Sequence, residues 1–131
     1  EAMRQAMAMA GRDPAEIDYL NLHGTGTRLN DSMEAAAVAT LFATPPACSS
    51  TKALTGHTLG AAGALEAAFC WLALDQGKRP RHVFDGDYDP DIPALPLVTT
   101  DAMPARPLRH ALSNSFAFGG NNASLLLSWA D

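Results

Sequence analysis

The part of the chain that decides the fold is residues 50–67, which read STKALTGHTLGAAGALEA. The beginning of this stretch predicts a short strand over residues 49–55. Its end predicts a helix that starts near Leu59 and runs to about Gln76, with Gly77 as the C-terminal cap. Because this helix is apolar on nearly every side, we expect it to be buried between other layers of structure.

The flanking sequence alternates in the same way between helices and strands. Apolar residues at helical spacing predict a helix over residues 3–10, and residues 17–23 predict a strand. A second helix is expected to begin at Asp31, with Glu34 completing a capping box. Further strands are predicted over 95–100, 108–115 and 124–129, the last two joined as a hairpin, and residues 79–96 are expected to be irregular. This order predicts a single layered α/β domain over residues 1–131.

Composition narrows the possible classes of function. The chain has 131 residues, 47% of them hydrophobic, and a net charge of -5. An acidic chain without a basic run is a poor candidate for binding nucleic acid, and no apolar run approaches the roughly 18 residues of a membrane span. Two cysteines do not make a disulfide framework, so a cytoplasmic location is expected. The start at Glu1, without a methionine, suggests a piece of a longer polypeptide.

Two histidines occupy similar positions in this pattern. His23 ends a predicted strand and is followed by small residues, and His57 follows a strand end and precedes a helix. Ligands of α/β folds bind at such strand ends, and neutral imidazoles there could donate hydrogen bonds to a developing oxyanion. The alternative is two ordinary histidines, but two similar placements favour function.

Two charged residues lie in apolar surroundings. Lys52 interrupts a small, apolar segment, and Glu66 is a lone charge in the apolar helix. Since an unpaired buried charge costs several kcal/mol, we expect the two to form a pair close to His57. The alternative is that each faces solvent at an edge.

Several other motifs are weaker. The run 24–27 lacks the third glycine of a dinucleotide site, and Pro90 stands where a calcium loop beginning at Asp85 needs glycine. Cys48 resembles a nucleophile motif, but it enters a strand and not a helix, so we interpret it as structural. The aromatic, glycine-rich tip at residues 116–120 is either a hairpin turn or a gate whose backbone N–H faces a site.

Four stretches together resemble the β-ketoacyl–acyl-carrier-protein synthases, most closely the type II condensing enzymes with a Cys-His-His site. They are residues 21–27 (NLHGTGT), 30–35 (NDSMEA), 50–67 and 114–124 (NSFAFGGNNAS). The resemblance spans essentially the whole chain but only the C-terminal half of that enzyme. It implies the α/β C-terminal half of a thiolase-like fold, with αβα layers and a mixed sheet, that pairs with the N-terminal half and forms a homodimer.

The reaction implied by the resemblance is acyl transfer to a cysteine, decarboxylation of malonyl on acyl-carrier protein, and Claisen condensation. His23 and His57 resemble the pair that binds the malonyl thioester carbonyl. Lys52 resembles the active-site lysine, and Glu66 its partner in the charged network.

The resemblance also implies groups that bind substrate or ions. Thr25 and Thr27 resemble the residues that bind the phosphopantetheine arm, the only carrier group expected, and no cofactor is required. Phe118 resembles the gating phenylalanine, and it and Gly119 are assigned to substrate binding. A structural monovalent cation is the remaining expectation. Its implied ligands are Asn21, Glu66, Ser113 and Asn114.

Two departures from the family pattern affect these expectations. The family's nucleophilic cysteine belongs to the N-terminal half, and Cys48 aligns with the strand before the lysine motif, so this chain alone is expected to be inactive. Asn121 stands where the family has threonine beside the gate.

Two alternatives remain beside the condensing enzyme. One is a non-catalytic subunit like the chain-length factors, although the presence of His23, Lys52 and His57 favours catalysis. The other is a thiolase, which carries a cysteine near a C-terminal glycine-rich segment, where residues 119–122 have none. The expected partner in the favoured reading is acyl-carrier protein, with neither nucleic acid nor a membrane involved.

Overall fold

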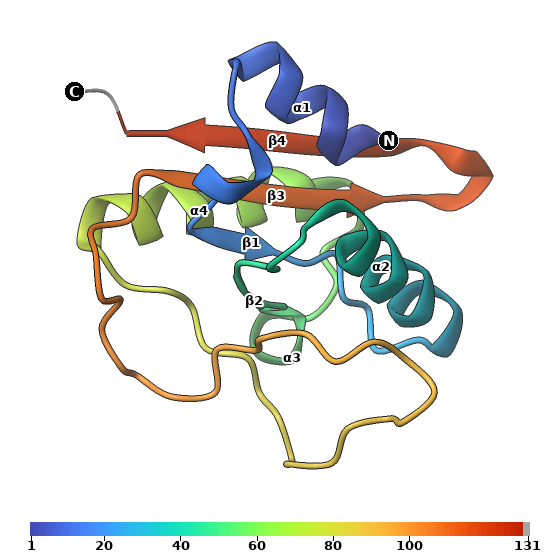
Figure 1. Cartoon of the computed structure of the whole chain (residues 1–131). Coiled ribbons are helices and arrows are strands. Elements are labelled where there is room, and N and C mark those ends of the chain that lie inside the picture. The colour runs from blue at the N-terminus through green and yellow to red at the C-terminus, as the bar shows by residue number, and fades with distance from the viewer. Residues whose placement is uncertain (130–131) are drawn as a thin grey trace.

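The computed structural model describes residues 1–129, in which a four-stranded mixed sheet separates helices on its two faces (Figure 1). The strand order is β2-β1-β3-β4, with β1 parallel to both neighbours and β4 antiparallel to β3. The strands are β1 (Tyr19–Asn21), β2 (Ala47–Ser49), β3 (His110–Phe116) and β4 (Asn122–Ser128). The helices are α1 (Ala2–Ala10), α2 (Arg28–Leu41), the single turn α3 (Lys52–Thr55) and α4 (Ala62–Gln76), with 3-10 turns at Pro14–Glu16, Leu59–Ala61 and Phe118–Gly120. The predicted α/β class is confirmed.

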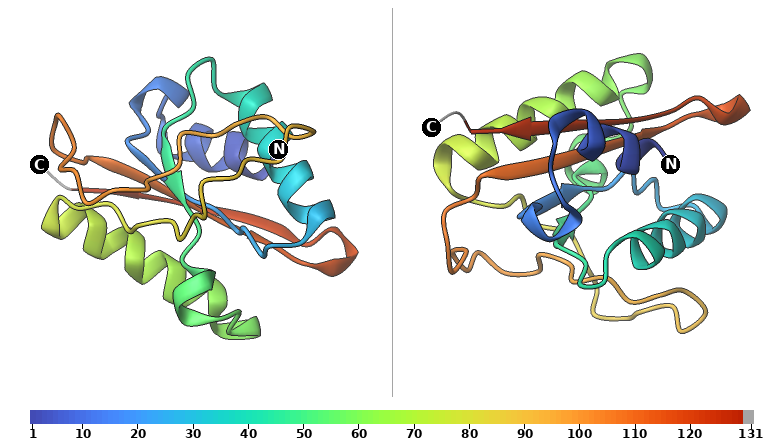
Figure 2. Two further views of the ribbon diagram at one scale, coloured as in Figure 1. Left: turned by 90° about the horizontal axis from the view of Figure 1, so that it is seen from below. Right: turned by 45° about the horizontal axis from the view of Figure 1, so that its top comes forward.

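The two faces of the sheet bury separate cores. Helices α1 and α2 cover one face and α4 covers the other, as the view from below in Figure 2 shows. Alternation along β1 divides its side chains between them, since Leu20 packs towards α1 and α2 while Tyr19 packs towards α4. The predicted division of this strand into two faces is confirmed, although its ladder is shorter than residues 17–23.

The crossover connections run on opposite faces of the sheet. Helix α2 joins β1 to β2, whereas α4 joins β2 to β3, which pairs with the other side of β1. The chain therefore changes direction around β1, and a crevice forms at the carboxyl ends of such strands. This places the loops after β1 and β2 next to each other.

The predicted strand over residues 49–55 is wrong. Strand β2 ends at Ser49, and Lys52–Thr55 forms one helical turn, closed by a hydrogen bond from the Gly56 N–H to the Lys52 carbonyl at 2.8 Å. Lys, Ala and Leu favour helix, and Gly56 adopts a φ of 73° that ends the turn. The lysine is consequently placed at a helix start and not within the sheet.

The predicted capping box at Asp31 is also wrong. Helix α2 begins three residues earlier, at Arg28, with Thr27 preceding it. The Glu34 carboxylate is buried and accepts the backbone N–H groups of His23 and Gly24, each at 2.9 Å. These two N–H groups need an acceptor, and Glu34 bonds to them instead of capping its own helix at Asp31.

The segment between α4 and β3 is irregular, as predicted, but it contains no strand over 95–100. Leu97 forms an isolated bridge with Cys48, whose N–H donates to the Pro96 carbonyl and whose carbonyl accepts from Val98. Prolines at 93 and 96 cannot donate to a ladder, which limits the pairing to this bridge. The segment still lies along the outer edge of β2.

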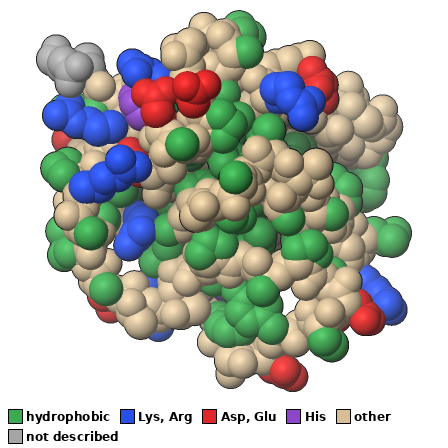
Figure 3. Space-filling view, in the orientation of Figure 1, with side chains coloured by type: hydrophobic (Ala, Val, Ile, Leu, Met, Phe, Trp, Pro, Cys, Tyr) green, Lys and Arg blue, Asp and Glu red, His purple; other side chains and the backbone are tan. Residues whose placement is uncertain are grey.

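Helix α4 is buried on one side only. Glu66, Cys70 and Ala73 face the sheet, whereas Trp71 and Leu72 are 52% and 39% exposed. Other large hydrophobic side chains, among them Met9 and Leu29, are also exposed. Figure 3 shows that hydrophobic side chains of all sizes reach the surface across the middle of the face viewed in Figure 1. Within residues 1–129, the helices are too short or too polar to cross a membrane.

The turn after β1 provides a test of this packing. Gly24 has a φ of 38°, and a Cβ there would lie 2.6 Å from the Ser50 Cβ. We expect Gly24→Ala to lower the free energy of unfolding by about 1–3 kcal/mol in denaturant titration, because both the backbone and the contact are incompatible with a methyl group. Gly60→Ala, where a Cβ meets open space, is the control and should change it by less than about 0.5 kcal/mol. Equal effects would show that this close approach is absent.

Candidate active site

The two predicted histidines meet at the end of β1. His23 directly follows the strand region and is buried, whereas His57 lies between α3 and the next turn. Their ring centroids are 5.5 Å apart in an edge-to-face arrangement. Residues separated by 34 positions in the sequence therefore bring two imidazoles to one point, as the sequence predicts.

The predicted pair of buried charges lies directly beside them. The Lys52 ammonium donates to the Glu66 carboxylate and, at 2.5 Å, to the His23 carbonyl. Both side chains are buried, 6% and 4% exposed, so each satisfies a charge that would otherwise be strongly destabilising. The lysine thus ties α4 to the backbone that carries the first histidine.

Glu34 and Ser50 hold the backbone of the same loop, although the sequence did not indicate a role at the site for either residue. The Glu34 carboxylate accepts N–H groups from His23 and Gly24, and its Oε1 also accepts from the Asn114 side chain at 3.0 Å. Ser50 Oγ donates to the Gly24 carbonyl at 2.7 Å. An acidic residue among the apolar positions of the predicted helix could have indicated that Glu34 is buried. Its spacing of three residues from Asp31 indicated a helix cap instead.

The environment of His23 favours its neutral form. Burial lowers the pKa of His23 to about 4, and the positive field of Lys52 and contact with His57 add to this effect. The Nδ1 atom of His57 accepts the Leu59 N–H at 3.1 Å. A neutral ring that accepts at Nδ1 carries its proton at Nε2 and can donate it, which is what an oxyanion needs.

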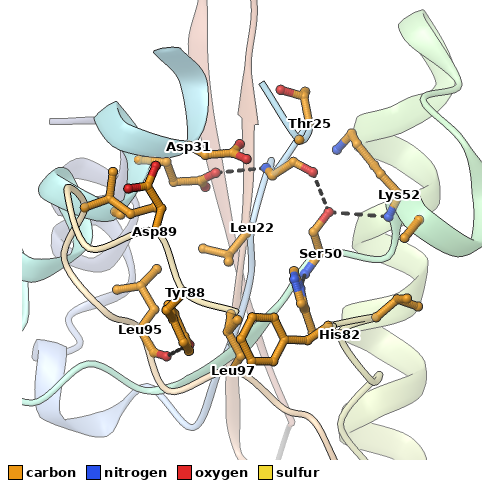
Figure 4. A pocket seen from close by; sticks show the side chains of 18 of the residues that line it. Leu22, Thr25, Asp31, Ser50, Lys52, His82, Tyr88, Asp89, Leu95 and Leu97 are labelled. Atoms are coloured by element: carbon orange, nitrogen blue, oxygen red, sulfur yellow. Dashed lines mark hydrogen bonds between the residues drawn. The ribbon is translucent and has the colours of Figure 1, made fainter. Parts of the chain in front are cut away.

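A cavity of about 520 Å³ opens beside this cluster (Figure 4). Its polar end is lined by Thr25, Lys52 and His57, and its apolar end by side chains that include Leu22 and Leu95. The hydroxyl oxygens of Thr25 and Thr27 lie 2.9 Å apart; Thr25 is half-buried and Thr27 is exposed. The structure therefore places both predicted threonines on the loop that follows His23, and Thr25 at the cavity.

The predicted gate lies at the hairpin and projects outwards. Phe118 is fully exposed, and Gly119 and Gly120 adopt positive φ values of 78° and 80°. The ring beside His23 is that of Phe116, with centroids 5.9 Å apart. Of the two phenylalanines at the tip, Phe116 contacts the histidine cluster and Phe118 is separate from it.

Neither cysteine has the environment of a nucleophile. Cys48 lies in β2 and Cys70 in α4, both fully buried. Burial raises the pKa of each thiol to about 12, so both stay protonated at neutral pH. This agrees with the structural interpretation of Cys48.

Three of the four groups predicted to bind a cation have free oxygens. Asn21 Oδ1, Ser113 Oγ and Glu66 Oε2 are buried and have no hydrogen-bond partner among the described residues. Asn21 and Ser113 are register partners on β1 and β3. Asn114 differs, because its side chain faces α2 and is bonded to Glu34 and Ser124. The three oxygens form a donor set of the kind that hard cations prefer.

The chain resembles known proteins along its whole length. Residues 1–84 match the family described as "Beta-ketoacyl synthase, C-terminal domain". The chain is 45% identical over 134 residues to the mitochondrial 3-oxoacyl-[acyl-carrier-protein] synthase of Arabidopsis thaliana. The aligned region covers 97% of this chain but only 28% of that protein. The chain therefore spans less than a third of this relative.

Solved structures give the same picture. The ketosynthase (ApeO) in complex with its chain length factor (ApeC) from Xenorhabdus doucetiae matches with a TM-score of 0.90 and 50% identity. A chain of the complex AntDE:AntF, described as a type II PKS acyl-carrier protein in complex with its ketosynthase, matches with a TM-score of 0.88 and 25% identity. Each match covers 98% of this chain and 32% of the other.

The protonation of His23 gives a direct test of the site's electrostatics. We expect an NMR titration to give a midpoint near pH 4 for His23, because burial and Lys52 both oppose its positive charge. The unfolded chain takes up this proton at an ordinary pKa of about 6.5, so stability contributed by neutral His23 should fall as pH drops from 6.5 to 4. A midpoint near 6.5 would contradict the described environment.

Proposed function

The chain belongs to the β-ketoacyl synthase C-terminal domain family, with the thiolase-like ketosynthase fold, and on this basis we propose that it is part of a 3-oxoacyl-[acyl-carrier-protein] synthase. The observation that carries the proposal is the pair of imidazoles 5.5 Å apart beside a buried Lys52–Glu66 pair. The reaction is decarboxylative Claisen condensation of malonyl on acyl-carrier protein with an enzyme-bound acyl group.

In this mechanism, the two histidines hold the thioester carbonyl of the malonyl group. The bond to the carboxylate breaks, CO₂ leaves, and the electron pair moves to the carbonyl oxygen as an enolate. Hydrogen bonds from His23 and His57 stabilise that oxyanion, because ring N–H groups aimed at one point can donate to the charge as it develops. The enolate carbon then attacks the acyl carbonyl, and the cysteine thiolate leaves.

The cysteine must come from polypeptide outside this chain. Both cysteines here are buried within the fold and have raised pKa values, so neither suits acyl transfer. The exposed hydrophobic side chains Leu54, Leu59, Trp71 and Phe118 support packing against a further portion of the enzyme. We therefore propose that the chain acts with the N-terminal half, within a homodimer in the cytoplasm, and that it is inactive alone.

The same proposal assigns the carrier arm to the exposed loop after His23. Thr25 lines the cavity and Thr27 lies beside it, and their hydroxyl groups could bind the amide groups of phosphopantetheine. The tip formed by Phe118 and Gly119 would close over this arm as a gate. The similarity to a ketosynthase in complex with its acyl-carrier protein supports that protein as the partner.

A second function is favoured by one of the comparisons. The matching Xenorhabdus structure contains both a ketosynthase and a chain length factor, so a non-catalytic partner subunit is the alternative. The presence of His23, His57 and Lys52 in one cluster favours catalysis, because a non-catalytic subunit has no use for two imidazole donors beside a buried ammonium.

Replacing a histidine distinguishes the two functions. In the complete enzyme, we expect His57→Ala to lower the rate of malonyl-acyl-carrier-protein decarboxylation by about 10²–10³-fold, the usual effect of losing one oxyanion donor. His110→Ala is the matched control, because this half-buried histidine contacts Ser128 at the other end of β3 and should leave the rate unchanged. Unchanged activity in His57→Ala would favour the chain-length-factor alternative.

We also propose that Asn21, Ser113 and Glu66 bind a structural monovalent cation. Their free oxygens support this, and the ion's charge would offset the second oxygen of Glu66. At equal ionic strength, we expect the melting temperature to be higher in potassium or sodium than in tetramethylammonium, because bound ion at a hundredfold excess over Kd adds about 2.7 kcal/mol to the free energy of unfolding. Ser113→Ala should reduce the difference. The same melting temperature in all salts would exclude the site.

A further inference from the structure

His82 lies outside the cluster of His23, Lys52, His57 and Glu66, but its side chain is hydrogen-bonded to the nearby backbone at Ser50. It lies in the irregular segment along β2, where its own N–H donates to the Val98 carbonyl at 2.7 Å. Its Nδ1 atom accepts the Ser50 N–H at 3.0 Å, and its ring lines the cavity together with Lys52 and His57, as Figure 4 shows for His82, Ser50 and Lys52. The contact therefore joins this segment to the loop between β2 and α3.

The Ser50 hydroxyl group connects the His82 contact to the loop after β1 and to the start of α3. Its Oγ donates to the Gly24 carbonyl at 2.7 Å and lies 3.4 Å from the Lys52 N–H, which donates to it. Gly24 follows His23, and the Lys52 ammonium is bonded to the His23 carbonyl. Ser50 is thus the point at which the loop after β1 and the start of α3 are held together.

We propose that His82 is a positioning residue for this site, acting through Ser50 on the placement of His23 and Lys52. This inference rests on the proposed condensing function for its meaning in catalysis. By fixing the Ser50 backbone, His82 sets where the Ser50 hydroxyl meets Gly24. A displacement of about 1 Å in such a contact is enough to misalign a reacting group.

The chemistry of the ring suits this role. Nδ1 can accept the Ser50 N–H only while the imidazole is neutral, and burial lowers the pKa of His82, which keeps it neutral. An aliphatic side chain would leave a part-buried N–H without an acceptor, and the loop would shift to satisfy it. Asparagine, by contrast, places an oxygen near the position of Nδ1.

The test compares three variants of the complete enzyme. We expect His82→Leu to lower kcat for malonyl-acyl-carrier-protein decarboxylation by about tenfold or more, with a smaller change in KM, because the main effect is on the alignment of the reacting groups. His82→Asn should restore most of kcat, since it keeps the acceptor. His110→Leu, a histidine bonded to Ser128 away from the cavity, should behave as wild type.

The positioning role of His82 can be refuted by more than one variant. Wild-type kcat in His82→Leu, or the same defect in His82→Asn as in His82→Leu at equal melting temperature, would overturn the proposal. If His82→Leu does not fold, His82→Asn is compared with His82→Gln, whose acceptor lies one bond farther from the backbone. Near-normal kcat only in the asparagine variant supports the proposal, and equal values overturn it.

A spectroscopic readout separates this inference from the proposed function. A wild-type enzyme without decarboxylase activity would refute the proposed function, but the ring signals of His23 and His57 can still be compared by NMR. We expect them to shift in His82→Leu and return in His82→Asn. Unmoved ring signals in His82→Leu would overturn the positioning role whatever the activity.

Discussion

The buried ammonium of Lys52 is the constraint on which the site depends. A charge in this position is tolerated only because the Glu66 carboxylate and the His23 carbonyl both accept from it. These two partners come from α4 and from the end of β1, which lie on different layers of the fold. Satisfying one charge therefore fixes the distance between α4 and the loop that carries the first histidine. The same positive charge adds to the effect of burial, which keeps that histidine neutral.

The opposite side of the same loop is held by an anion. Glu34, on α2, accepts the N–H groups of His23 and Gly24, while the Lys52 ammonium donates to the His23 carbonyl, so a carboxylate and a cation hold the peptide group between His23 and Gly24. The short backbone segment between them has few conformations left. A rigid backbone is what allows two imidazoles to act as preorganised donors, because no reorganisation is needed when charge develops on a bound carbonyl.

The sequence predicted the features that depend on residue type in a local pattern. His23 and His57 in small-residue loops, and Lys52 and Glu66 in apolar surroundings, indicated a paired cluster that the structure confirms. The strand over 49–55 was wrong because a short apolar run fits a strand or a helical turn equally well. The partners of Glu34 and His82 could not be predicted, since each contact joins residues far apart in the chain, 32 positions apart for His82 and Ser50.

The role of the two histidines is tested most directly by a structure of the complete enzyme with an unreactive malonyl thioester analogue. We expect the thioester carbonyl oxygen to lie about 3 Å from a ring nitrogen of both His23 and His57, with the Lys52–Glu66 pair intact behind them. An analogue bound with its carbonyl oxygen out of reach of either ring would contradict the assignment of the two histidines as the groups that stabilise the enolate.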